Sequence, residues 1–236
     1  DDVAVVLRSL VDYRTAEVVD IVAETARADA AGALTIWDLS HAGGVLTVDL
    51  HAAGVQLAVG CTYKFLNGGP GAPAWTYVSS SLQADVRQPI WGWWSQQDMF
   101  AMGATYTPRD DIGRFHIGTP SILALTAADA GISLTAEAGI TNVQVKAHHL
   151  THFGIQLCDA LGLETCTPRD AHRRGGHVAV VHPRARELTT ALTARKVIGD
   201  FREPDIVRLG MSPLTTRYVD VFDGMTAVAE EIARLP

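Results

Sequence analysis

The stretch VQLAVGCTYKFLNGGPG, residues 55–71, joins an apolar run to a lysine and a glycine-rich turn. Residues 55–60 have the length and composition of a buried strand, and Asn-Gly-Gly-Pro-Gly at 67–71 indicates a turn. Lys64 therefore falls just beyond the carboxyl end of a strand, with little bulk beside it. An amine in such a cleft can lose its hydration and become nucleophilic. By spacing alone, a surface lysine that caps the strand is the commoner outcome.

Other short apolar runs flank this stretch, and strands are expected at residues 3–7, 33–39 and 75–78. The first of these has the composition of a buried strand. Between the first two, residues 15–28 place apolar side chains mainly at helical spacing. Alternation of strands with helical or crossover segments is typical of an α/β fold with a mostly parallel, doubly wound sheet. Such sheets bind ligands beyond the carboxyl ends of their strands, where Asp38 and Lys64 both fall.

The rest of the chain divides into a loop, two helices and a smaller unit. Residues 91–114 are aromatic and aperiodic, which indicates a long loop of the kind that is usually functional. Helices are expected from residue 119 to about 136 and over 143–161. Beyond residue 165 we expect strands at 177–181, 197–201 and 205–209 and helices at 185–194 and 218–235. The predicted organisation is a partial large domain (1–136), a connecting helix (137–164) and a small C-terminal α+β domain (165–236).

Composition excludes several classes of function. The 236 residues carry a net charge of −7 with scattered basic residues, which argues against nucleic-acid binding. No apolar run approaches the roughly 18 residues needed to cross a bilayer. The three cysteines match neither a disulfide framework nor a CxxC metal site, which favours a reducing cytoplasm.

A carboxylate at the end of a buried strand, such as Asp38, is costly without a cationic partner. A protonated pyridine nitrogen would be one such partner. His41, three residues on, could hold Asp38, stack on a flat cofactor or simply occupy a turn. Potential metal ligands also lie close together here: Asp38, His41, Asp49 and His51. Their spacing matches no metal motif, so we expect no metal, and a metal-dependent hydrolase stays as a third alternative.

Three stretches together resemble a known family: IWDLSHAGG (36–44), GCTYKFLNGGPG (60–71) and GDFREP (199–204). They are similar to kynureninase, a fold-type I pyridoxal-phosphate hydrolase of the aspartate aminotransferase superfamily. The resemblance runs in order over nearly the whole chain, including the small domain. It implies the C-terminal part of a fold-type I large domain, because members of the family extend much further at the N-terminus.

The resemblance also implies roles for individual residues. Lys64 would form the Schiff base with pyridoxal phosphate, Asp38 would face the pyridine nitrogen, and His41 would lie against the cofactor ring. Tyr63 would contact the phosphate and take part in catalysis. Arg208 would grip the substrate α-carboxylate, an anion that suits a planar guanidinium fork.

Three further cofactor contacts follow from the resemblance: Ser9, Trp93 and Thr119, the last of which could be reached from a partner subunit. Each of these residues could instead have a purely structural role. Trp93 could be a core or interface aromatic, Thr119 a helix N-cap and Ser9 a turn residue.

The activity implied is hydrolysis of L-kynurenine or 3-hydroxykynurenine to an anthranilate and L-alanine, in tryptophan catabolism or a related biosynthetic pathway, by a homodimer with a shared active site. Trp94-Ser95-Gln96 and Thr215 depart from the family pattern, so an enzyme acting on a modified aryl ring stays open. A cysteine desulfurase would need a mobile cysteine, and Cys61 lies too near Lys64 for that role. The missing N-terminal stretch leaves a non-catalytic fragment as the alternative from another class.

Overall fold

The computed structural model describes residues 2–235, and its first sheet contains four strands. These are β1 (Val5–Ser9), β2 (Leu34–Asp38), β3 (Leu57–Cys61) and β4 (Ala74–Val78), hydrogen-bonded in that order. The first three are parallel and β4 is antiparallel to β3. The prediction of an α/β fold with a mostly parallel sheet is confirmed.

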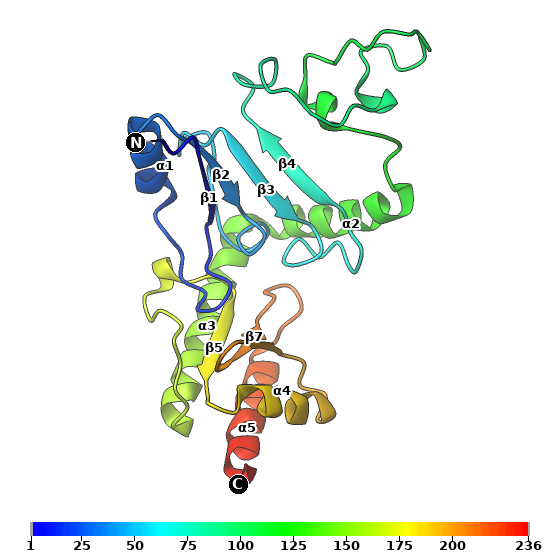
Figure 1. Cartoon of the computed structure of the whole chain (residues 1–236). Coiled ribbons are helices and arrows are strands. Elements are labelled where there is room, and N and C mark those ends of the chain that lie inside the picture. Colours follow the sequence, from blue (N-terminus) through cyan, green and yellow to red (C-terminus); the bar gives the residue numbers. More distant parts are fainter. Residues whose placement is uncertain (1, 236) are drawn as a thin grey trace.

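The register of this sheet brings its polar strand ends together. Ser9 lies opposite Asp38, and Asp38 opposite Val59. Because the three strands are parallel, their carboxyl ends share one edge, which faces the second sheet in Figure 1. Residues that follow β2 and β3 in the sequence therefore emerge at the same place.

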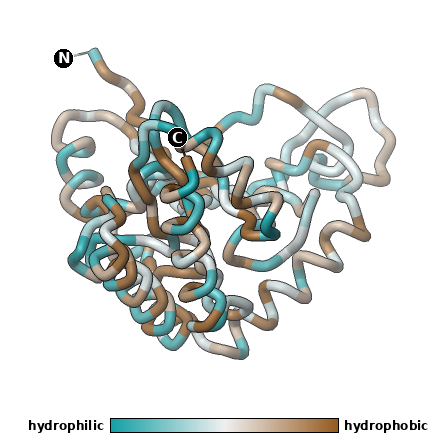
Figure 2. Tube along the Cα trace, turned by 90° about the horizontal axis from the view of Figure 1, so that it is seen from below, coloured by the Kyte–Doolittle hydropathy of each residue, from teal (hydrophilic) through white to brown (hydrophobic). Residues whose placement is uncertain are grey.

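Strand β1 is exposed rather than buried, contrary to the expectation from its composition. It is the edge strand of the sheet, paired with β2 on one side, and Val5 and Leu7 are 49% and 70% exposed. Figure 2 shows the apolar trace running from the N-terminus into this strand.

Helix α1 (Ile21–Ala30) packs on β2 and begins later than the sequence pattern predicts. The Asp12 carboxylate accepts hydrogen bonds from the amides of Arg14 and Thr15 at 2.9 and 2.7 Å, which holds that segment in a turn. The helix starts only where the Asp20 side chain caps the amide of Ala23.

A second sheet has the antiparallel order β5-β7-β6. Its strands are β5 (His177–Val181), β6 (Asp200–Arg202) and β7 (Ile206–Gly210), with helices α4 (Ala185–Ala194) and α5 (Tyr218–Arg234). Strand β6 is shorter than expected, because the amide of Val197 still bonds to the carbonyl of Leu192 in α4.

Two long helices connect these sheets. Helix α2 (Ile122–Ala138) ends at Gly139, whose φ of +79° breaks it from α3 (Ile140–Leu161). Ala147 of α3 belongs to the core under the first sheet, while Leu150 and Ile155 belong to the core of the second. Helix α3 is thus part of both cores.

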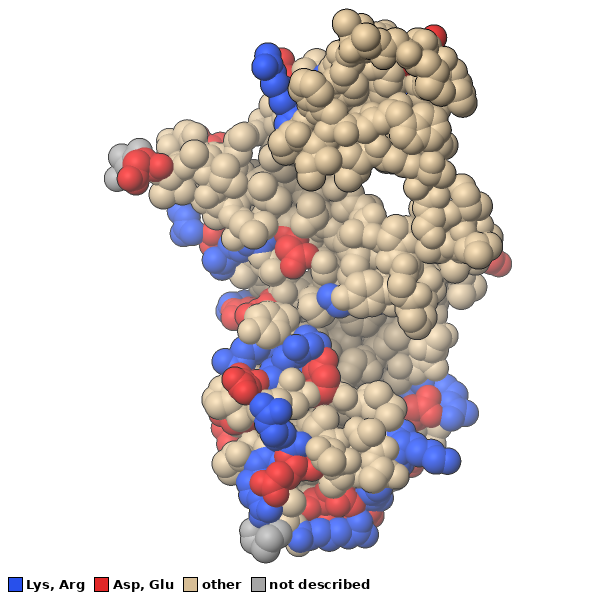
Figure 3. Space-filling model, turned by 45° about the vertical axis from the view of Figure 1, so that its right-hand side comes forward, with Lys and Arg blue, Asp and Glu red and all other residues tan. Residues whose placement is uncertain are grey.

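Residues 79–121, which we call the arm, leave the body between β4 and α2 (Figure 1). The arm contains only the short 3-10 helices Trp93–Ser95 and Ile112–Phe115. In Figure 3 its surface is mostly uncharged, whereas acidic and basic residues alternate over the second sheet and its helices. Among the described residues, no helix is long and apolar enough to cross a membrane.

Candidate functional site

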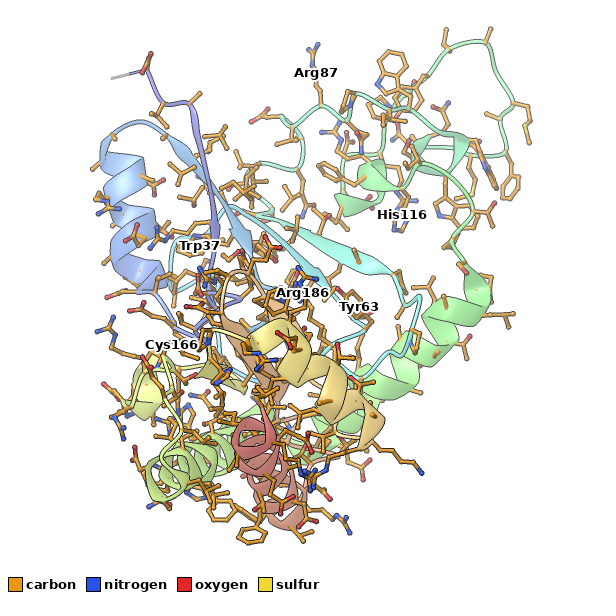
Figure 4. The ribbon with its side chains drawn as sticks, turned by 60° about the horizontal axis from the view of Figure 1, so that its bottom comes forward. Trp37, Tyr63, Arg87, His116, Cys166 and Arg186 are labelled. Atoms are coloured by element: carbon orange, nitrogen blue, oxygen red, sulfur yellow. The ribbon has the colours of Figure 1, made fainter. Side chains whose placement is uncertain are left out.

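A cavity of about 630 Å³ lies between the carboxyl edge of the first sheet and the second sheet. The first sheet and its loops contribute His41, Tyr63 and Lys64, and the second contributes His177, Asp200, Arg202 and Arg208. Figure 4 shows Tyr63 on this side of the first sheet, whereas the labelled residues Arg87 and His116 lie on the arm.

Asp38 ends β2 as an ionised carboxylate. One oxygen accepts the amide hydrogen of Ser40 at 2.9 Å and the other accepts the hydroxyl of Ser9 at 3.0 Å. Burial alone would raise the pKa of Asp38, but the hydrogen bonds from Ser40 and Ser9 and the charge of Lys64 outweigh it and lower the pKa. The local structure therefore keeps a negative charge at the strand end.

Lys64 follows β3 and is held by the turn after it. The amide of Gly68 donates to the carbonyl of Thr62 at 2.8 Å, closing the chain around Lys64. Helix α2 packs directly on this turn: a Cβ on Gly131 would come within 2.5 Å of the Asn67 backbone. The lysine nitrogen lies 5.3 Å from the centre of the Tyr63 ring, so both side chains enter the same space.

Two neutral histidines, His41 and His177, line the cavity. Burial and the charges of Lys64 and Arg208 lower the pKa of His41 to about 4. Burial lowers the pKa of His177 to about 3, and the Arg208 charge adds to this shift. The ring centres are 6.1 Å apart. Both imidazoles are uncharged at neutral pH, so they act as dipoles and ring surfaces rather than as cations.

Arg208 is fixed from three sides. Its Nε donates to Oδ1 of Asp200 at 2.9 Å, and its Nη2 donates to the other oxygen of Asp200. Its Nη1 donates to the carbonyl of Tyr13 at 2.6 Å and lies 3.4 Å from Nε2 of His41. Only 10% of the Arg208 side chain is exposed, so the guanidinium is held rigidly at the cavity wall.

The structure brings together six of the residues singled out from sequence: Ser9, Asp38, His41, Tyr63, Lys64 and Arg208. It does not bring Trp93 or Thr119 to this cavity. Trp93 is on the arm, with ring centres 5.0 Å from Trp94 and 6.2 Å from Phe100, and Thr119 lies just before α2.

Sequence reasoning missed Asp200 and His177. Asp200 lay within one of the three stretches that resemble a family, but its role depends on hairpin pairing with Arg208, which strand composition does not show. His177 read as an ordinary residue in an apolar strand. Within residues 2–235, no three His, Cys, Asp or Glu side chains are grouped so that they could hold a metal ion.

Comparison with known proteins identifies the relatives of the chain. It is 41% identical over 237 residues to a kynureninase from Pseudomonas fluorescens, covering 99% of this chain and 57% of that protein. It is 40% identical to a kynureninase from Burkholderia mallei (strain SAVP1), covering 98% and 56%. Residues 143–228 match the kynureninase C-terminal domain. The chain is a relative of the kynureninases. It spans a little over half the length of these curated relatives.

Solved structures agree with this kinship at the level of the fold. The kynureninase-like chain superimposes on a cysteine desulfurase from Thermococcus onnurineus NA1 with a TM-score of 0.83 at 17% identity, covering 98% of this chain and 60% of that one. An alanine–glyoxylate aminotransferase from Nostoc sp. gives a TM-score of 0.76 at 19% identity, with coverage of 97% and 62%. The expected resemblance to kynureninase and the expected fold are both confirmed.

Proposed function

We propose that this chain carries the cofactor lysine and the substrate-carboxylate site of a pyridoxal-phosphate enzyme that hydrolyses L-kynurenine or 3-hydroxykynurenine to an anthranilate and L-alanine. One observation supports the proposal above others. Lys64 and Arg208 come from separate stretches and line one cavity, and the Asp38 carboxylate interacts electrostatically with Lys64, in a chain 41% identical to a kynureninase. A cytoplasmic location belongs to the same proposal.

The residues present fit pyridoxal phosphate at the ring end. Asp38 is ionised, and the charge of Lys64 helps to lower its pKa, so it can stabilise a protonated pyridine nitrogen. His41 is neutral and offers a ring surface nearby. Lys64 supplies the amine that the cofactor aldehyde requires, and Tyr63 places a phenol beside it. When bound, pyridoxal phosphate supplies an electron sink for charge at the substrate α-carbon.

Different side chains of the protein bind the substrate and transfer protons. Arg208 binds the α-carboxylate through the part of its guanidinium that Asp200 leaves open. The Lys64 amine, once free, accepts the α-proton. Water then adds to the γ-carbonyl of the substrate and the Cβ–Cγ bond breaks, which releases the anthranilate. The exposed phenol of Tyr63 lies in the same cavity and delivers the proton to Cβ that completes the alanine product.

We also propose that the active enzyme is a homodimer. Phe100 and Met102 on the arm and Leu123 at the start of α2 are 72%, 79% and 87% exposed, and a second copy would cover these apolar side chains. Such an arm could carry Trp93 and Thr119 to the partner's site. Light scattering should give twice the chain mass, and Leu123→Glu should lower it toward that of one chain.

A second candidate is a kynureninase-like enzyme for a differently substituted aryl ring. Thr215 lines the cavity, and the resemblance implies a tyrosine at this position in kynureninases, so we propose that this wall takes part in recognising the aryl ring. Incubation with ring-substituted kynurenines and identification of the aromatic product by mass spectrometry would separate the two candidates.

The central test is to add pyridoxal phosphate to the protein, record the visible absorbance, reduce with borohydride and map the labelled peptide. The sequence has three lysines, so the map discriminates cleanly. We expect the pyridoxyl group on Lys64 and none after Lys64→Arg. Lys146→Arg and Lys196→Arg are matched controls that should label like the parent protein.

The expected result should be followed by release of anthranilate from L-kynurenine. Because the relatives are longer, the same experiment should be repeated on the chain extended to their length. Absence of label on Lys64 in both forms would refute the proposed cofactor chemistry.

A further inference from the structure

The hairpin of β6 and β7 places one carboxylate between two arginines at the cavity wall. Asp200 and Arg208 are directly opposed in the antiparallel register, so their side chains emerge side by side. Arg202 lies two residues further along β6 and therefore on the same face. Asp200 accepts from Arg208 Nε at 2.9 Å and from Arg202 Nη2 at 2.9 Å, so one carboxylate bridges both cations.

The bonding of Arg208 defines which of its edges a ligand can use. Asp200 occupies the edge formed by Nε and Nη2. At the remaining edge, between Nη1 and Nη2, Nη1 donates to the carbonyl of Tyr13 and lies 3.4 Å from Nε2 of His41, while among the described residues the second Nη2 hydrogen has no partner. One carboxylate can therefore bind Arg208 end-on, and the side-on position is already filled by the protein itself.

The charges around the cavity make this arrangement selective. Its lining carries three cations, Lys64, Arg202 and Arg208, and within the described chain Asp200 is its one acidic residue. His41 and His177 are neutral. Without Asp200, two neighbouring guanidinium groups would be available to a second ligand carboxylate. With Asp200 present, that second carboxylate meets a negative charge instead.

We propose that Asp200 is a specificity-determining residue, which restricts the cavity to amino acids that carry a single carboxylate and rejects those with acidic side chains. The proposal rests on the function proposed above, in that the cavity binds an amino acid through Arg208. It adds a role for a residue that does not touch the reacting atoms.

L-Glutamine and L-glutamate test the proposal, because they have nearly the same shape and differ by one charge. Their dissociation constants for the full chain, measured by ligand-observed NMR titration, give a glutamate-to-glutamine preference. We expect the parent protein to favour glutamine and Asp200→Asn to shift the preference toward glutamate at least about fivefold, as expected for one charge removed at a partly exposed site.

Asp205→Asn is the matched control. Asp205 is on the same hairpin and similarly exposed, but it pairs with Arg14, so its neutralisation should leave the preference unchanged. Asp200→Ser provides a second variant of different size, and thermal melting of each variant shows that it folds. A general loss of structure would weaken both ligands together and leave their ratio unaltered.

Three outcomes would overturn the proposal: a parent protein that already prefers glutamate, an Asp200→Asn preference like that of the parent, or no binding of either amino acid to any variant. These outcomes are distinct from failure of the proposed function, which is decided by labelling of Lys64. If Lys64 is labelled but Asp200→Asn leaves the preference unchanged, the proposed cofactor chemistry stands and the proposed role of Asp200 is refuted.

Discussion

Replacement of Asp38 by Asn should weaken pyridoxal phosphate binding strongly while preserving the local fold. The Asn side-chain oxygen can still accept from the amide of Ser40, so the strand end keeps its 2.9 Å hydrogen bond. The substitution removes the negative charge of the Asp38 carboxylate, which Ser9, Ser40 and Lys64 keep ionised. Its pairing with a pyridine cation about 3 Å away has an upper limit of about 5 kcal/mol at an effective dielectric constant of roughly 20.

Asp38 is only half-buried, so solvent screening reduces that limit to about 2–3 kcal/mol. The expected dissociation constant is therefore roughly 30- to 150-fold higher than that of the parent protein. Titration of pyridoxal phosphate, followed by absorbance, measures it directly. Asp49→Asn, at an exposed loop position, is the control and should bind like the parent. An Asp38→Asn protein that binds within twofold of the parent would refute the role given to Asp38.

Three further predictions concern stability. Thr25→Val should destabilise the fold by about 1–3 kcal/mol in urea unfolding, because the buried Trp37 indole would lose its 3.0 Å hydrogen bond to Thr25; an unchanged midpoint would contradict this. Burial lowers the pKa of His177 from 6.5 to about 3, so between these two pH values the unfolded chain binds that proton and the folded chain does not. Stability should then fall with decreasing pH by about 1.4 kcal/mol per unit more than in His177→Gln, whereas parallel pH profiles would exclude the effect. Gly92→Ala should lower the melting temperature, since its Cβ would lie 1.5 Å from a backbone oxygen, and Gly103→Ala, with open space, should match the parent.

Features set by local chemistry could be predicted from the sequence. Residues that follow an apolar run, such as Asp38 and Lys64, are placed at the strand ends by the pattern of their own neighbours. The helix of residues 218–234 and the strand of residues 177–181 were expected within a residue of where they occur, because their periodicity and flanking residues agree.

Features that depend on contacts between distant segments could not be predicted in this way. The late start of α1 depends on side-chain bonds of Asp12 that compete with helix formation. The place of β1 as the outermost strand of the described sheet depends on the order of the strands, which composition does not encode. The bridge from Asp200 to Arg208 requires the register of two strands, and no periodicity along one strand encodes that register.

Helix α3 limits how this protein could be re-engineered. Since Ala147 and Ile155 lie on one continuous helix but in different cores, a graft that exchanges the second sheet must preserve the rotational phase of α3. An insertion or deletion of one residue between them would turn one end by about 100° relative to the other. Chimaeras joined inside α3 should therefore tolerate only insertions or deletions that correspond to whole helical turns. In a recombination library, the junctions are better placed before Gly139 or after Gly162.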